Sequence, residues 1–161
     1  MPMRLTHCCL ALGLLSCSSC SSRQTSGGRF AVQTERTSYP TPIAWHPSVV
    51  IPFVMRNVAE IDVFVAHCGS GLAWTLQQAT DTTWTDAFAF ECPLILTPPL
   101  DLRPGAVAVD TARIGTPNFI PTPGSYRIVV RAFWTRAAAE SHRDAQLIPI
   151  GQRASNPFRF R

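Results

Sequence analysis

PTPGSYRIVVRAFWTR, residues 121–136, is the stretch of the sequence that decides the fold. After the turn at Pro123-Gly124, the side chains alternate between two faces for about five pairs. Residues 126, 128, 130, 132 and 134 fall on one face, and residues 127, 129, 131 and 133 fall on the other. A period of two with β-branched and aromatic residues is typical of a β-strand, and this length suits a central one. We therefore expect residues 121–136 to form the inner spine of an all-β domain.

Shorter alternating runs follow one another along the rest of the chain, separated by turns that contain Pro and Gly. The predicted strands span residues 30–36, 48–57, 61–67, 72–79, 84–90 and 106–114, with residues 95–102 as an extended edge and residues 146–150 and 156–161 as the closing strand or strands. Short strands at a spacing of roughly ten residues predict an antiparallel β-sandwich of about seven or eight strands. Because Pro52 lacks the backbone N–H of a regular central strand, we expect a bulge there or a strand that begins at Phe53.

The overall composition limits the classes to which the protein can belong. A chain of 161 residues with 46% hydrophobic residues and 14 prolines suits one loop-rich β domain and a leader. The formal net charge is +4, and all 14 basic residues are Arg. These residues are scattered and form no basic stripe with stacking aromatics, so nucleic-acid binding is not expected.

The first 22 residues, MPMRLTHCCLALGLLSCSSCSS, have the pattern of an export signal. Arg4 is followed by an apolar run of about eight residues, which is too short to span a bilayer. The run ends in LLSC, residues 14–17, which resembles the lipobox of bacterial lipoproteins. An ordinary secretory signal and a chain that is not exported are the alternatives.

The lipobox resemblance implies an organisation for the whole chain. Residues 1–16 are then a signal peptide, and Cys17 carries the acyl chains that hold the protein in the lipid bilayer, with Cys20 as the second candidate. Residues 17–28 are rich in Ser and form a flexible tether, and residues 29–161 form the domain. The protein is then anchored in the bacterial cell envelope, and Ser18 favours the outer membrane, or a side that faces the periplasm, in a diderm.

The order of motifs in the domain resembles that of two kinds of β-sandwich. It is similar to secreted bacterial immunoglobulin-like domains and to the bacterial intracellular proteinase inhibitors. The resemblance is carried by Phe53, Met55, Asn57, Leu102, Pro104-Gly105, Pro123-Gly124, Tyr126 and Asn156-Pro157-Phe158. It implies an immunoglobulin-like sandwich, with proteinase inhibition in the envelope as an alternative function. Sandwiches of this kind place a tyrosine corner after such a turn, so we expect the Tyr126 hydroxyl to bond to nearby backbone.

The two cysteines of the domain, Cys68 and Cys92, could serve in either of two ways. An exported protein enters an oxidising compartment, where cysteines pair, and no other cysteine of the domain competes. We therefore predict a Cys68–Cys92 disulfide. A zinc or copper site with His67, His46 and His142 is the alternative. Because the domain, residues 29–161, has no CxxC or HxxxH spacing, we expect neither a metal nor a cofactor.

Residues that could carry catalysis are sparse. Ser70 lies in the turn Gly69-Ser70-Gly71, which lacks the spacing and the helix of a nucleophile elbow. The carboxylates occur singly, so no acid–base pair can be assigned. We therefore expect a protein that is not an enzyme, and turnover that depends on Ser70 or His67 is the rival hypothesis.

Two tryptophans are possible contact residues. Trp74 and Leu76 are expected to face one way on a hairpin, with Trp84 and Phe88 across the ladder. Core filling is one role for such a pair, and a contact surface for another envelope protein or a glycan is the other. The sequence thus predicts an anchored envelope protein that presents a binding or structural module.

Overall fold

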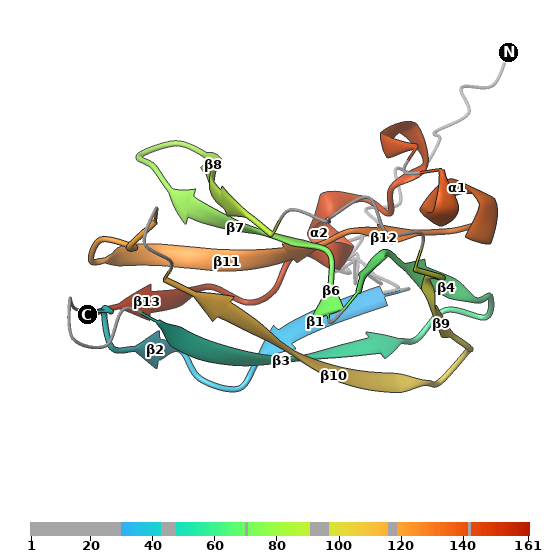
Figure 1. Cartoon of the computed structure of the whole chain (residues 1–161), viewed down its shortest axis with the longest axis horizontal. Helices are drawn as coiled ribbons and strands as arrows, with labels where there is room; N and C mark the ends of the chain where they lie inside the picture. The colour runs from blue at the N-terminus through green and yellow to red at the C-terminus, as the bar shows by residue number, and fades with distance from the viewer. Residues whose placement is uncertain (1–29, 43–47, 70, 91–96, 116–118, 142) are drawn as a thin grey trace, which may run out of the picture.

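The computed structural model describes residues 30–42, 48–69, 71–90, 97–115, 119–141 and 143–161. The predicted signal peptide, Cys17, Cys20 and the tether lie outside these residues, as do Ser70 and Cys92. The described residues form two layers of strands that face each other, with short helices packed near one end (Figure 1).

Strands make up about half of the described residues. They are β1 (Phe30–Thr34), β2 (Ser38–Tyr39), β3 (Val49–Asn57), β4 (Val63–Val65), β5 (His67–Cys68), β6 (Gly71–Leu72), β7 (Trp74–Ala79), β8 (Trp84–Ala89), β9 (Leu100–Leu102), β10 (Val107–Ile114), β11 (Gly124–Val130), β12 (Ala132–Phe133) and β13 (Phe158–Phe160). The helical segments are α1 (Arg136–Glu140), the 3-10 turn η1 (Asp144–Gln146) and α2 (Ile150–Arg153). The predicted all-β class is confirmed.

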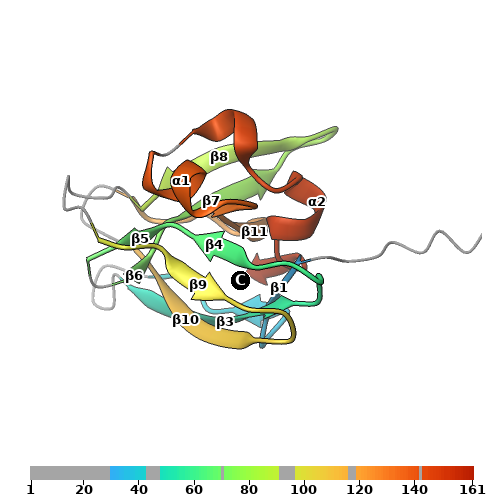
Figure 2. The same ribbon diagram turned by 90° about the vertical axis from the view of Figure 1, so that its right-hand side faces the viewer.

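Two sheets form the sandwich. One has the strand order β1-β3-β10, and the other has the order β2-β13-β11-β7-β8. Their ladders are antiparallel except that β13 runs parallel to β2. A small sheet, β12-β4-β9, lies at one end of the sandwich (Figure 2), and β5 pairs with β6. Buried side chains from β3, β7 and β11 meet between the two main sheets and form the core.

Two of the predicted strands change partners midway, which is one reason why the chain has more strand segments than the sequence predicts. Residues 61–67 become β4 and β5, and residues 121–136 become β11 and β12. At the two breaks, the Ala66 N–H donates to the Arg131 carbonyl at 2.9 Å, and the Arg131 N–H donates to the Ala73 carbonyl at 2.9 Å. The backbone hydrogen bonds thus continue as the chain passes from β11, which pairs with β7, to β12, which pairs with β4.

Strand β3 runs through Pro52 without a bulge, so the expected interruption is wrong. Its register with β10 is continuous over the whole length of β10. The Pro52 carbonyl lies on the side of β3 that faces β1. It accepts a hydrogen bond from the Glu35 N–H, just after the end of β1, at an N···O distance of 3.4 Å. Because β1 ends at Thr34, opposite Phe53, the missing N–H of Pro52 falls just beyond that ladder.

Strand β11 is the spine of the larger sheet, and a buried tyrosine lies near its start. Tyr126 is 1% exposed, and its hydroxyl donates to the Thr122 carbonyl at an O···O distance of 2.9 Å. This is the bond that a tyrosine corner makes. The ring packs against Phe158 and Phe160 of β13. Since a hydroxyl in a core needs a partner, this bond holds the turn before β11 against the strand.

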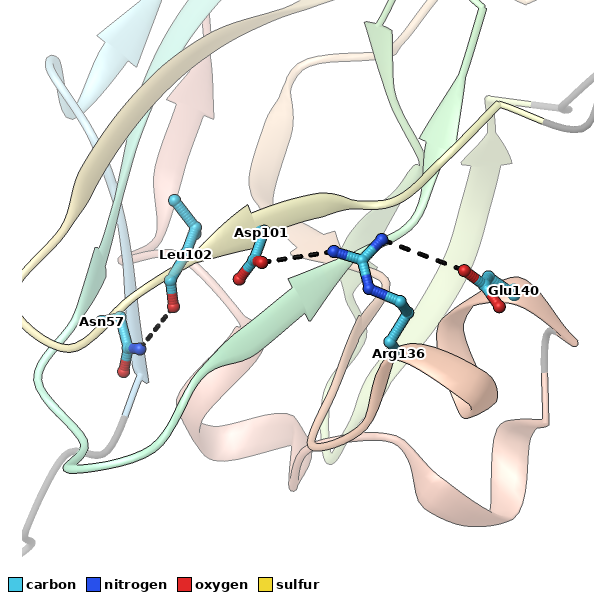
Figure 3. Close-up of polar contacts among 5 residues, drawn as sticks. All are labelled: Asn57, Asp101, Leu102, Arg136 and Glu140. Atoms are coloured by element: carbon cyan, nitrogen blue, oxygen red, sulfur yellow. Dashed lines mark hydrogen bonds and ion pairs between the residues drawn. The ribbon is translucent and has the colours of Figure 1, made fainter.

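A buried asparagine ties the end of β3 to β9. Asn57 is 0% exposed. Its Nδ2 donates to the carbonyls of Ile61, at 2.8 Å, and Leu102, at 2.7 Å, and its Oδ1 accepts from the Ala59 N–H at 3.0 Å. Figure 3 shows the bond to Leu102. The Asn57 side chain therefore closes the turn after β3 and also holds β9 in place.

One ion pair at the surface joins helix α1 to β9, and a second lies within the helix. Arg136 Nη2 lies 3.2 Å from Asp101 Oδ2, and Arg136 Nη1 lies 3.9 Å from Glu140 Oε1 (Figure 3). The same guanidinium lies 5.3 Å from the ring centroid of Phe64. Because these groups are exposed, we expect each ion pair to contribute only about 0.2–1 kcal/mol.

Residues 146–150 do not form the closing strand that the sequence predicts. They include the last residue of η1 and the first residue of α2. Within them Ile148 is buried, and its N–H donates to the Ala132 carbonyl at 2.9 Å. Pro149 follows at once and has no N–H with which to extend the pairing. The predicted closing strand at residues 156–161 is present as β13.

Strand β10 turns its valines outward. Ala112 and Ile114 are buried in the core, whereas Val107 and Val109 are 48% and 65% exposed. Arg113 lies on the same outer face and is exposed. The alternation of this strand is as predicted, but only the packed sandwich decides which of its faces is covered.

Candidate binding surface

The β7–β8 hairpin places its two tryptophans on opposite faces of the sheet. Opposite Leu76 and Gln77, β8 contains one extra residue, Ala87, which forms a β-bulge. Because strand side chains alternate, an extra residue reverses the face of everything beyond it. The expectation that Trp74 and Trp84 share a hairpin face is therefore wrong.

Trp74 fills the core. It is 4% exposed, and its ring centroid lies 5.8 Å from that of Phe88 and 5.8 Å from that of Phe90. The ring of Phe90 is stacked on it, with an interplanar angle of 11°. Aromatic contacts of this kind stabilise an interior, so Trp74 does not belong to a contact surface.

Trp84 lies instead on the outer face of the five-stranded sheet, where it is half-buried. The guanidinium carbon of Arg127, on β11, lies 4.5 Å from the centroid of the Trp84 ring. Arg127 Nε donates to Gln77 Oε1 at 2.9 Å, and Gln77 Nε2 donates to Asp86 Oδ1 at 2.7 Å. We call these four residues the Trp84 cluster. Its hydrogen-bond chain crosses β11, β7 and β8, so the cluster is assembled from three adjacent strands.

The Trp84 cluster is held in one arrangement by its own contacts. A cation–π contact at an exposed site contributes about 0.5–1 kcal/mol. Burial lowers the pKa of Arg127 by removing water from the guanidinium, which nevertheless stays charged at neutral pH. Because the rotamers of Arg127, Gln77 and Asp86 are already fixed, a ligand that contacts them loses less conformational entropy on binding.

Arg153, the last residue of α2, lies on the same side of the sheet. Its Nε donates to the Ile148 carbonyl at 2.8 Å, and its Nη1 donates to the Val130 carbonyl at 3.4 Å. These backbone oxygens fix the guanidinium against the end of β11. Arg153 is therefore part of the fold as well as part of the surface.

The charges around Arg153 are mixed, with an excess of positive charge. Burial lowers the pKa of Arg153, and the charges of Arg131 and Arg127 lower it further, whereas Asp144 and Asp86 act in the opposite direction. Arg131 Nη2 lies 2.6 Å from Asp144 Oδ1. Three guanidinium groups and two carboxylates thus lie near one another on this face.

Of the residues considered for metal or nucleophilic chemistry, the structure describes His67 and Cys68, whereas His46, Ser70, Cys92 and His142 lie outside the described residues. His67 in β5 is half-buried, and the adjacent Cys68 is 2% exposed and disulfide-bonded. Because Cys92 lies outside the described residues, the pairing of Cys68 with Cys92 stays a prediction. In the described part of the chain, no group of three or more His, Cys, Asp or Glu residues could hold a metal ion.

The sequence pattern places Arg127 on the polar face of its strand but does not connect it with Trp84. Arg127 and Gln77 are opposite each other in the β11–β7 ladder, and Gln77 is opposite Asp86 in the β7–β8 ladder. These pairs depend on the register of three strands. The sequence indicates only that each of these strands has a polar residue at an outward position. It does not indicate which of these residues lie opposite each other.

No protein-family model matches the chain, and no curated protein matches it. Some solved structures resemble it weakly. A β-glucosidase from Erythrobacter marinus has 14% identity and a TM-score of 0.37, and the match covers 82% of this chain and 15% of the enzyme. A mutant β-glucosidase from Listeria innocua in complex with laminaribiose has 11% identity and a TM-score of 0.35, with 82% and 16% covered. The Listeria innocua β-glucosidase in complex with glucose has 14% identity and a TM-score of 0.32, with 63% and 14% covered.

The chain therefore spans 14% to 16% of the length of these enzymes, and TM-scores this low assign no function to it. Among the described residues, no helix is long and apolar enough to cross a membrane.

Proposed function

We propose that this protein is a lipid-anchored protein of the bacterial cell envelope whose immunoglobulin-like sandwich is a non-enzymatic binding module. The single observation that supports the binding role is the Trp84 cluster, which holds a half-buried tryptophan on the outer face of a sheet. Tryptophan and arginine are the residues that most often dominate the binding energy of interfaces. Here both types lie in contact at a surface position, already ordered by hydrogen bonds.

The position of the cluster suits such a role. The cluster lies on strands rather than on a loop, so its geometry is set by the backbone ladders. In the proposed envelope protein, the tether would let this face reach a partner at some distance from the lipid surface.

The anchor is tested by replacing Cys17. We expect Cys17→Ala to abolish acylation, so that most of the protein moves from the membrane fraction to the soluble fraction. Labelled fatty acid and cell fractionation measure both effects, and Cys20→Ala is the matched control that should keep the label. Label that persists in Cys17→Ala and disappears in Cys20→Ala would move the anchor to Cys20.

The binding role is tested by affinity capture from solubilised envelopes of the source bacterium, with quantification of what is retained. We expect Trp84→Ala to reduce specific retention at least tenfold, equivalent to about 1.4 kcal/mol or more of binding free energy. Arg113→Ala is the control, because Arg113 is exposed on the outer face of the other sheet. Equal retention by wild type, Trp84→Ala and Arg113→Ala, with thermal unfolding unchanged, would reject the Trp84 cluster as the contact surface.

A further inference from the structure

Arg127 has hydrogen-bonding capacity that the described part of the chain does not use. A guanidinium has five N–H donors in a planar fork, and the bond from Arg127 to Gln77 uses only Nε. Among the described residues, the two Nη atoms of Arg127 have neither a hydrogen-bond acceptor nor an ion-pair partner. The group is also partly removed from water, which is why its pKa is lowered. An anion that reached it would be attracted more strongly than at a fully hydrated site.

The surroundings of Arg127 add to the attraction for an anion. Asp86 keeps its negative charge, because Gln77 is neutral, and the charge of Asp144 is offset by Arg131, whereas Arg153 adds a positive charge near Arg127. Arg159 on β13 is exposed and lies opposite Ser125, two residues before Arg127 on the same face of the sheet. The balance on this face is therefore positive.

The groups next to Arg127 suit a ring with one apolar face and a polar edge. Trp84 offers a flat, partly exposed aromatic surface. Gln77 and Asp86 offer planar hydrogen-bonding groups beside it. A pyranose sugar has this combination, since its C–H groups can pack on an aromatic ring while its hydroxyls bond at the edge.

If the Trp84 cluster is the contact surface, as proposed above, its ligand can be specified more closely. We propose that the cluster binds an acidic saccharide, that is, a sugar polymer with carboxylate groups. The sugar ring packs against Trp84, a carboxylate pairs with the Nη fork of Arg127, and hydroxyls bond to Gln77 and Asp86. A guanidinium fork fits the two oxygens of a carboxylate, which makes the acidic sugar the better fit compared with a neutral one.

The test is a titration of the purified full chain with three probes of similar length, followed by calorimetry. The probes are oligogalacturonate, a neutral galactose oligomer and oligoglutamate. We expect oligogalacturonate to bind with a Kd of about 1 mM or tighter at 0.15 M salt, and at least about tenfold more tightly than either other probe. Oligoglutamate has the same acidic group without the sugar ring, so it measures simple charge attraction.

Two variants test the separate contributions of Arg127 and Trp84 to binding. Arg127→Gln should remove the preference for the acidic over the neutral oligomer, and Trp84→Ala should weaken oligogalacturonate binding at least about tenfold. Arg113→Gln on the other sheet is the control, and its Kd should stay within about twofold of wild type. The thermal unfolding midpoint of each variant shows that the domain is still folded.

The outcomes distinguish failure of the acidic-saccharide proposal from failure of the proposed binding role. Absence of oligogalacturonate binding, or equal binding of oligoglutamate, overturns the acidic-saccharide proposal. If affinity capture then still depends on Trp84, the binding module stands and its partner is of another class, such as a protein. If capture is also unaffected by Trp84→Ala, the Trp84 cluster is rejected as a binding surface.

Discussion

Asn57→Ala is expected to destabilise the folded domain by about 3–4 kcal/mol. The side chain is fully buried and makes three hydrogen bonds, to Ile61, Leu102 and Ala59. Alanine would leave two carbonyl oxygens and one N–H without their partner, and each unsatisfied buried group costs about 1–3 kcal/mol. The loss is a large share of the stability of a small domain, which is about 5–15 kcal/mol in total.

Urea unfolding followed by intrinsic fluorescence measures this loss, provided that the slope of the transition is unchanged. Asn57→Asp sharpens the test, because it keeps the acceptor for Ala59 but sets a carboxylate against two carbonyl oxygens. We expect it to destabilise at neutral pH at least as strongly as alanine. Gln146→Ala, at an exposed position, should change stability by less than about 0.5 kcal/mol. A loss below about 1 kcal/mol for Asn57→Ala would mean that the three hydrogen bonds of its side chain, of which Figure 3 shows the one to Leu102, are not formed.

Cys68→Ala should destabilise the domain by about 3 kcal/mol in the chain-entropy model of disulfides. Cys68 is disulfide-bonded and packs in a small apolar cluster with Ala73 and Phe133. Cys92 is the predicted partner, and it comes after the β7–β8 hairpin in the sequence. The bond would fix the chain just beyond that hairpin, so its loss should first loosen the contact between Trp74 and Phe88.

A double-mutant comparison identifies the partner. Cys68→Ala, Cys92→Ala and the double variant should all lose about the same stability, because the first substitution already removes the whole bond. Each is compared with wild type by urea unfolding, and hydrogen exchange of β7 and β8 amides reports the local loosening. If Cys92→Ala has no effect, or mass spectrometry of the exported protein shows both thiols free, the Cys68–Cys92 pairing is wrong.

Much of the fold follows from local sequence alone. The alternation after Pro123-Gly124 is sufficient to predict the strand that became β11, and the place of Tyr126 is sufficient to predict its bond to the preceding turn. Spacing of turns also predicts the all-β class. These features depend on neighbouring residues, whose side chains share a face or share a turn whatever the rest of the chain does.

Other features depended on which strands lie next to each other. Pro52 is tolerated in β3 only because β1 ends beside it, and no local pattern contains that fact. Val107 and Val109 alternate as predicted, yet the packing of the sandwich leaves them outside. Similarly, the alternation of residues 121–136 continues beyond Val130, but the chain changes partner there.

The candidate surface was decided by the tertiary structure. The sequence by itself determined that residues 72–90 form a hairpin with two tryptophans and that Arg127 lies on the polar face of its strand. Because of the bulge at Ala87, Trp84 lies on the outer face of the sheet, whereas Trp74 lies in the core. The register of β8, β7 and β11 brought Arg127 over the Trp84 ring. Alternation determines only which residues of one strand share a face, whereas register and bulges are set by cross-strand packing over the whole sheet.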